Sequence, residues 1–130
     1  MILGIDPGRE KTGLAVIDGQ KIVWRAIILP ANLLEELRAV AQKFALNKIA
    51  LGDSTSSQDA RKQLENAEFL KSIPLQIVVE KNSTLEARTL YFEEFPPRGL
   101  KKLIPLSLQV PPENVDDFAA AVIARRALPE

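Results

Sequence analysis

Three acidic residues, Asp6, Asp53 and Glu80, each come directly after a short apolar run of the kind that forms a buried strand. Open α/β sheets bind their ligands at the carboxyl ends of the strands, so we expect these carboxylates to lie along one sheet edge. Like charges gathered there repel one another unless a cation lies among them. The pattern therefore favours a metal site, although Asp6 also suits the turn at Pro7-Gly8 and Asp53 also suits a helix cap.

A second acidic group, Glu113, Asp116 and Asp117, begins a stretch that we predict to be helical from Glu113 to Leu128. On a helix, side chains three and four residues apart share a face, so all three acids are further candidate metal ligands. The helix dipole also favours acids at this position, which is the structural alternative. The alanines that follow favour close packing of the helix on a sheet, with its first turn beside the other acids.

The chain has no histidine and no cysteine, which excludes an imidazole general base, a thiolate nucleophile, a disulfide and a typical zinc site. Catalysis is left to carboxylates, Lys, Ser/Thr or Tyr, and this set favours a hard cation that prefers oxygen ligands, Mg²⁺ or Mn²⁺. Two such cations would activate a water molecule and stabilise the leaving oxygen in an in-line displacement at phosphorus.

Basic residues offer only local attraction for nucleic acid, because the 17 basic and 17 acidic residues give a net charge of zero. The candidate phosphate contacts follow Glu80 or belong to the proline-flanked segment near residue 100. They are Lys81, Arg88, Arg98, Lys101 and Lys102. Solvated surface charge is the alternative for each of them.

The order of the predicted elements defines the fold class. Strands are predicted at residues 1–6, 13–17, 21–28, 48–52 and 74–80. Helices are predicted at residues 32–46, about 57–71, 83–95 and 113–128, the third with a capping box at Ser83 and Glu86. A three-strand meander followed by strand–helix alternation predicts one α/β domain over residues 1–130. Its five-stranded mixed sheet has three antiparallel and then two parallel strands, with helices on both faces.

Membrane and export signals are missing from the sequence. No apolar run approaches the roughly 20 residues that span a bilayer, and the N-terminus has neither the basic segment nor the cleavage site of a signal peptide. We therefore expect a cytoplasmic protein that does not enter a membrane.

Three segments resemble a known family. Ile5-Asp6-Pro7-Gly8 with Thr12-Gly13-Leu14-Ala15 resembles the opening of RuvC-like Holliday junction resolvases. The segment from Val79 to Arg88 resembles the D-E-R-x-S/T-T-x-E-A motif of their YqgF-type branch, the putative pre-16S rRNA nucleases. Val115-Asp116-Asp117-Phe118-Ala119-Ala120 is similar to the family's V-D-x-x-A-A. The three matches occur in order from one end of the chain to the other.

This resemblance implies an RNase H-like fold and cleavage of structured nucleic acid that depends on Mg²⁺ or Mn²⁺, with two ions bound. The implied substrate is branched DNA for the resolvases and precursor 16S ribosomal RNA for the YqgF-type branch. Asp6, Glu80 and Asp116 take the catalytic carboxylate positions. Resolvases need two active sites for two symmetric strands, which favours a homodimer.

The chain departs from the family pattern at three places. Val79 and Lys81 flank Glu80 where the YqgF-type branch has Asp and Arg, so an acid and a bidentate phosphate contact are lost. Gly52-Asp53-Ser54 replaces a Gly-Leu-Pro turn, which adds Asp53 as a possible ligand. The segment 96–112 is longer than expected, and its structure is left open. These differences favour a divergent substrate.

Two other functions stay open at this point. The same fold begins the sugar and acetate kinases with a D-x-G phosphate loop, but those enzymes need a second lobe that 130 residues cannot supply. A catalytically silent nucleic-acid-binding or scaffold domain is favoured by the zero net charge and the altered neighbours of Glu80. It is disfavoured by retention of all three acids, and metal binding discriminates it from a nuclease.

Overall fold

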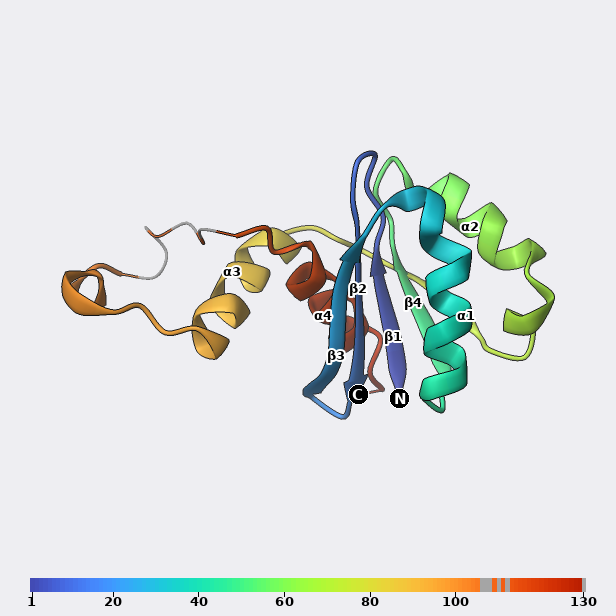
Figure 1. The fold of residues 1–130 in the computed structure, drawn as a ribbon, viewed down its shortest axis with the longest axis horizontal. Coiled ribbons are helices and arrows are strands. Elements are labelled where there is room, and N and C mark those ends of the chain that lie inside the picture. Colours follow the sequence, from blue (N-terminus) through green and yellow to red (C-terminus); the bar gives the residue numbers. More distant parts are fainter. Residues whose placement is uncertain (106–108, 110, 112, 130) are drawn as a thin grey trace.

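Five strands form one mixed sheet in the order β3-β2-β1-β4-β5 (Figure 1). The computed structural model describes residues 1–105, 109, 111 and 113–129. The strands are β1 (Ile2–Asp6), β2 (Thr12–Asp18), β3 (Lys21–Ile28), β4 (Lys48–Gly52) and β5 (Leu75–Val78). The first three strands pair antiparallel, and β1, β4 and β5 pair parallel. The predicted sheet is confirmed.

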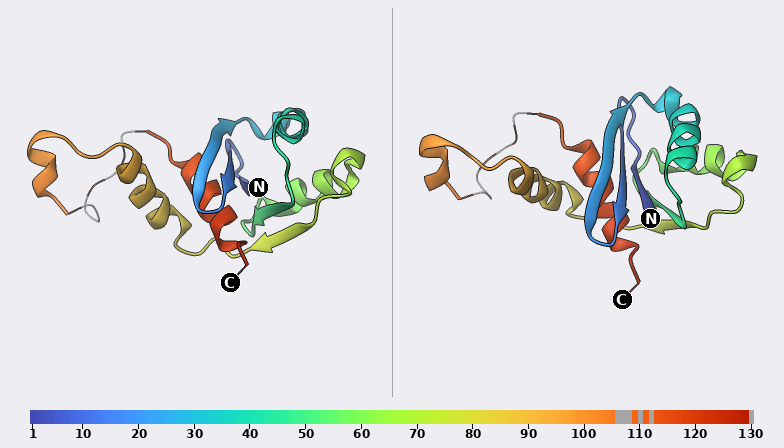
Figure 2. Two further views of the ribbon diagram at one scale, coloured as in Figure 1. Left: turned by 90° about the horizontal axis from the view of Figure 1, so that it is seen from below. Right: turned by 60° about the horizontal axis from the view of Figure 1, so that its bottom comes forward.

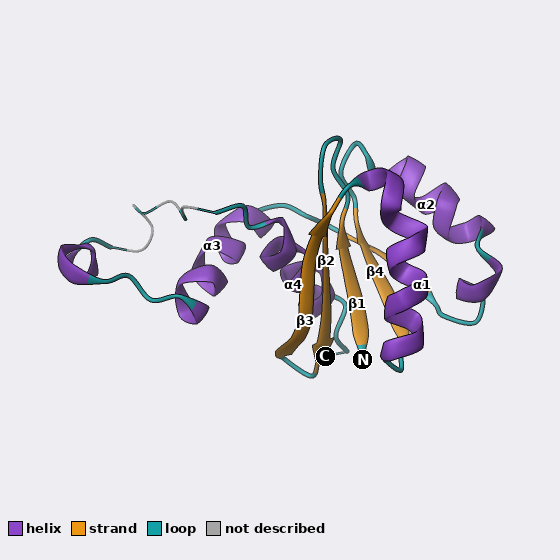
Figure 3. Cartoon of the chain, viewed as in Figure 1, coloured by secondary structure: helices purple, strands orange, loops and turns teal. Residues whose placement is uncertain are grey.

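Two helical layers cover the sheet, one on each face (Figures 2 and 3). The helices are α1 (Leu33–Lys43), α2 (Ser57–Asn66), α3 (Ser83–Glu94) and α4 (Asp116–Arg126). Side chains alternate along β1, so Leu3 and Ile5 pack with α1 and α2, while Ile2 belongs to the core that α3 and α4 complete. The predicted α/β class with helices on both faces is therefore also confirmed.

Helix α4 lies very close to the sheet because two glycines and a run of alanines remove the side chains between them. A methyl group at Gly4 would overlap the carbonyl of Ala120, and one at Gly13 would overlap the carbonyl of Asp116. Gly13 is the antiparallel partner of Asp6. The first residue of α4 therefore lies against the strand pair that ends in Asp6.

Several predicted boundaries are wrong by a few residues. The last helix begins at Asp116 rather than Glu113, because Val115 has the non-helical backbone of a cap. The predicted second helix ends at Asn66 and is followed by a separate 3₁₀ turn over Glu68–Leu70. The last strand ends at Val78, two residues before the predicted end.

The predicted capping box at Ser83 is also wrong. Asn82 occupies the cap position with a left-handed backbone, φ 65°, which asparagine tolerates better than most residues. Ser83 is thereby the first helical residue, and the Glu86 side chain binds Arg126 instead of the helix cap.

The segment after α3 projects away from the sheet (Figure 1). It contains a 3₁₀ turn over Gly99–Leu103, in the region whose structure the sequence left open. None of the helices in the described ranges is long and apolar enough to span a bilayer.

Candidate acidic active site

The carboxyl groups of Asp6 and Glu80 meet at the carboxyl edge of the sheet and are within hydrogen-bonding reach of each other. Asp6 is the last residue of the central strand β1, and Glu80 follows β5, with β4 between the two strands. Gly52, at the end of β4, makes the contact possible, because a methyl group there would overlap the Glu80 carboxylate. A glycine in the intervening strand thus lets Glu80 reach across to Asp6.

Asp53 holds the backbone of Glu80 in place. Its Oδ1 atom accepts a hydrogen bond from the Glu80 backbone N–H at 3.0 Å. The next residue, Ser54, donates its hydroxyl proton to the Pro7 carbonyl oxygen at 2.9 Å, which joins the loop after β4 to the turn after β1. The loops that carry Asp6 and Glu80 are therefore tied together through residues 53 and 54.

Burial raises the pKa of both carboxyl groups, and the charges of neighbouring acids add to the effect. The pKa of Asp6 rises to about 8, first because the group is buried, then because of the charge and hydrogen bond of Glu80 and the charge of Asp116. Burial also raises the pKa of Glu80, and the charge of Asp53 adds to this effect. The hydrogen bond from Asp6, the Ser54 backbone N–H and the Arg126 charge oppose it. Near neutral pH the metal-free pair therefore retains a proton.

The donor set fits a divalent cation. Glu80 Oε1 is buried and has no hydrogen-bond donor among the described residues, and the contact with Asp6 is a hydrogen bond only while the pair holds a proton. A cation at this position would take the place of that proton and satisfy the oxygen. Within the described ranges, no three acids are arranged closely enough to hold one ion as the side chains now lie. Asp116 is near enough for its charge to raise the pKa of Asp6.

The structure separates the other predicted acidic ligands. Asp117 is buried and pairs with Arg25 on β3, with Asp117 Oδ2 at 2.8 Å from the guanidinium, while its Oδ1 accepts the Phe118 backbone N–H at 3.0 Å. Glu113 is exposed and precedes α4, so the predicted helical face shared by Glu113 and Asp116 is wrong. The structure thus brings Asp6 and Glu80 into contact, with Asp53 bound to the Glu80 backbone and the charge of Asp116 acting on Asp6.

The predicted phosphate contacts fall into two groups. Lys81 is exposed immediately after Glu80, and Arg88 is half-buried on α3. Arg98 and Lys102 are exposed on the projecting segment (Figure 1), and the side chain of Lys101 lies outside the described residues. Contacts between these residues and a phosphate backbone stay predictions.

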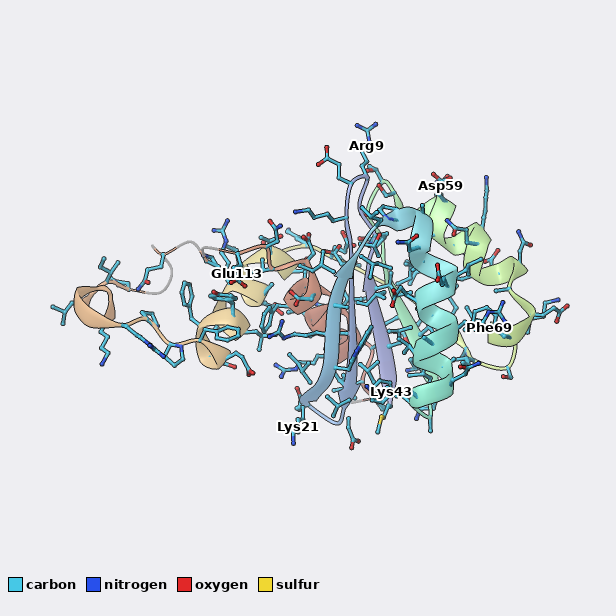
Figure 4. The ribbon with its side chains drawn as sticks, in the orientation of Figure 1. Arg9, Lys21, Lys43, Asp59, Phe69 and Glu113 are labelled. Carbon is cyan, nitrogen blue, oxygen red and sulfur yellow. The ribbon has the colours of Figure 1, made fainter. Side chains whose placement is uncertain are left out.

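A polar hollow of about 540 Å³ lies beside the turn after β1, on the face of the sheet that α2 covers, and neither Asp6 nor Glu80 lines it. Pro7 and Thr12 line it from the turn after β1, and Thr55, Ser56 and Asp59 line it from the start of α2. Figure 4 shows Arg9 and Asp59 at this end of the molecule, and Lys21 and Lys43 at the opposite end. The turn that follows Asp6 therefore borders this hollow.

Two arginines near the acids were missed by the sequence analysis. Arg25 lies within the apolar strand β3 and binds Asp117. A single charge inside a β-branched run is a signal of a buried partner that could have identified Arg25. Arg126 binds Glu86 and the carbonyl of Val79. No sequence signal distinguishes Arg126 from the basic residues that helix C-termini ordinarily carry.

Comparison with known proteins gives a structural answer only. The sequence matches no protein-family model and no curated protein. The fold is similar to that of Thermus thermophilus RuvC in complex with a Holliday junction substrate, with a TM-score of 0.62 and 18% identity. It is also similar to another Thermus thermophilus RuvC structure, with a TM-score of 0.58 and 16% identity. Each match covers 96% of this chain and 90% of the other. The chain thus has the fold of these RuvC structures.

Proposed function

We propose that this protein is a metal-dependent endonuclease that cleaves the phosphodiester backbone of a structured nucleic acid. The observation that carries the proposal is the half-buried pair Asp6 and Glu80, two carboxyls in contact whose pKa values are both raised by burial. With both carboxylates ionised, such a pair is unfavourable without a cation, and perturbed carboxyls at a strand-end edge are typical of a functional site in an open α/β sheet.

Asp6, Glu80 and Asp116 are the residues that would hold Mg²⁺ or Mn²⁺, with two ions as the expected number. When bound, the ions supply a nucleophile from water and stabilise the charge on the leaving oxygen. The protein's own contribution is to hold the Glu80 carboxylate beside Asp6 with hydrogen bonds. Asp53 fixes the Glu80 backbone, and Ser54 donates a backbone N–H to the Glu80 carboxylate.

Branched DNA is the first substrate to test, because the similar Thermus thermophilus structure is a RuvC complex with a Holliday junction. Precursor ribosomal RNA is the second, because residues 79–88 resemble the YqgF-type motif. Exposed Lys81 next to Glu80 is suitably placed to contact a phosphate of either polymer. Symmetric cleavage of a junction requires two sites, so a homodimer is part of this proposal.

A catalytically silent nucleic-acid-binding or scaffold domain is the second candidate. This alternative is favoured by the positions of the acidic side chains, because no three acids among the described residues converge on one ion position. A silent domain has no reason to bind divalent cations at the Asp6–Glu80 pair.

The test is cleavage of a labelled four-way DNA junction and a labelled structured RNA with Mg²⁺ or Mn²⁺. Asp6→Asn is the inactive variant, and Asp59→Asn is the matched control, because Asp59 is an exposed acid on α2 that does not contact the pair. We expect cutting by the wild type and by Asp59→Asn but not by Asp6→Asn. The absence of cutting in every case, together with no metal binding, would establish the silent domain instead.

A further inference from the structure

The position of Glu80 is not fixed by the sheet. Strand β5 ends at Val78, which is the last residue that pairs with β4. Val79 is 62% exposed, so its side chain contributes little anchoring by burial. The backbone around Glu80 is held instead by two side chains from elsewhere in the chain. One is Asp53, which binds the Glu80 N–H, and the other is Arg126.

Arg126 binds both sides of the segment that carries Glu80. Its Nη1 donates to the carbonyl oxygen of Val79 at 2.6 Å, and its Nη2 donates to Glu86 Oε1 at 2.9 Å. Val79 immediately precedes Glu80, and Glu86 lies in the first turns of α3. The planar guanidinium fork suits two acceptors at once, which the ammonium of lysine does not match.

Helix α4 carries both Asp116, whose charge acts on Asp6, and Arg126, which binds the segment around Glu80. Asp116 is the first residue of α4, and Arg126 is the last. Because Gly4 and Gly13 let α4 pack tightly on β1 and β2, the helix is a rigid reference for both contacts. The Arg126 side chain is 24% exposed and that of its partner Glu86 is 56% exposed.

We propose that Arg126 is a positioning residue for the nuclease site: by binding Val79 and Glu86 together, it holds the Glu80 carboxylate against Asp6. This inference rests on the proposed function. Arg126 has no direct part in the reaction and acts only through Glu80. Misplacing a reacting group by about 1 Å costs on the order of 100-fold in rate, which sets the expected size of the effect.

The experiment compares Arg126→Ala, Arg126→Lys and Lys48→Met in the full chain. Lys48 is the matched control, because its Nζ donates to the Ala127 carbonyl at 2.8 Å and so anchors the same end of α4 without contacting the Glu80 segment. We measure kcat and KM on whichever substrate the wild type cuts, Mn²⁺ affinity by calorimetry, Tm, and hydrogen exchange at the Glu80 amide.

For Arg126→Ala we expect kcat to fall about 100-fold with KM unchanged, weaker Mn²⁺ binding and faster exchange at the Glu80 amide. Arg126→Lys should recover part of the kcat, and Lys48→Met should lower Tm while leaving kcat, Mn²⁺ affinity and the amide unchanged. If Arg126→Ala matches Lys48→Met in kcat, in Mn²⁺ affinity and in exchange at the Glu80 amide, the positioning role is overturned. If the wild type neither cuts nor binds Mn²⁺, the proposed function fails, and amide exchange alone then decides whether Arg126 fixes Glu80.

Discussion

Asp6 and Glu80 lie within hydrogen-bonding reach of each other although their strands are separated by β4. Gly52 is the residue of β4 over which the Glu80 side chain passes. This relationship makes the pair sensitive to protons, to cations and to any atom added at Gly52.

Protons should stabilise the metal-free protein. The folded-state pKa of Asp6, about 8, lies above its ordinary value of 3.8, so the folded protein binds more protons than the unfolded chain between these values. Stability from this group is therefore fully present below about pH 4 and is lost as the pH rises toward about 8. In the presence of a chelator we expect the Tm of the wild type to fall across this window relative to that of Asp6→Asn.

The control for this pH series is Asp59→Asn, which should follow the wild type. Identical Tm profiles for wild type and Asp6→Asn between pH 4 and pH 8 would show that Asp6 is not the buried acid that the structure describes.

Gly52→Ala should disable the site while leaving the fold intact. The added methyl overlaps the Glu80 carboxylate and displaces it from Asp6. We expect cleavage to fall on the order of 100-fold, and stability to fall by about 1–3 kcal/mol, as is typical of overpacking. In a Glu80→Ala background the clash is gone, so adding Gly52→Ala should cost little further stability. If Gly52→Ala destabilised the wild type and the Glu80→Ala protein equally, the added methyl would clash with a group other than Glu80.

Asp53 should act as a hydrogen-bond acceptor for the Glu80 backbone. Asp53→Asn keeps an acceptor oxygen and should retain activity within about threefold, whereas Asp53→Ala loses it and should lose about tenfold, the equivalent of roughly 1.4 kcal/mol for one hydrogen bond. The measurement is kcat/KM at saturating Mn²⁺. An Asp53→Asn protein as impaired as Asp53→Ala would instead support the metal-ligand role that the sequence predicted.

The Arg25–Asp117 pair should matter for stability rather than for metal binding. Arg25→Ala leaves the Asp117 carboxylate buried without its partner, and we expect a loss of about 3 kcal/mol in the free energy of unfolding by urea. Asp117→Asn should be destabilised as well, yet should bind Mn²⁺ like the wild type. Loss of Mn²⁺ binding in Asp117→Asn at a temperature where it is folded would assign Asp117 to the metal site.

The strands and the way they pair could be predicted because they depend on local sequence patterns. The Asp18-Gly19 turn and the alternation of strand and helix predicted a mixed sheet of three antiparallel and then two parallel strands, and the acids at strand ends predicted that Asp6 and Glu80 lie at one edge. Gly13 and Gly52 were not recognised as contact points, because close approach of another element to a glycine leaves no periodic pattern in the sequence.

The remaining errors arise from long-range partners. Asp117 looks like a third acid in a helix turn, but its carboxylate binds Arg25, which is 92 residues away in the sequence. The Ser83–Glu86 capping box failed because Asn82 occupies the cap position, and the Glu86 side chain binds Arg126, 40 residues away. Local sequence predicts the partner of such a side chain only when no distant charged residue binds it instead.

Calorimetric titration with Mn²⁺ at pH 7, in two buffers of different ionisation enthalpy, is the decisive test of whether the Asp6–Glu80 pair binds a divalent cation. A cation that binds the Asp6–Glu80 pair must displace the proton that the pair shares. We expect Mn²⁺ binding that releases protons in the wild type and that is lost in both Asp6→Asn and Glu80→Gln. Binding that is unchanged in these two variants, or no binding by the wild type at all, would contradict this expectation.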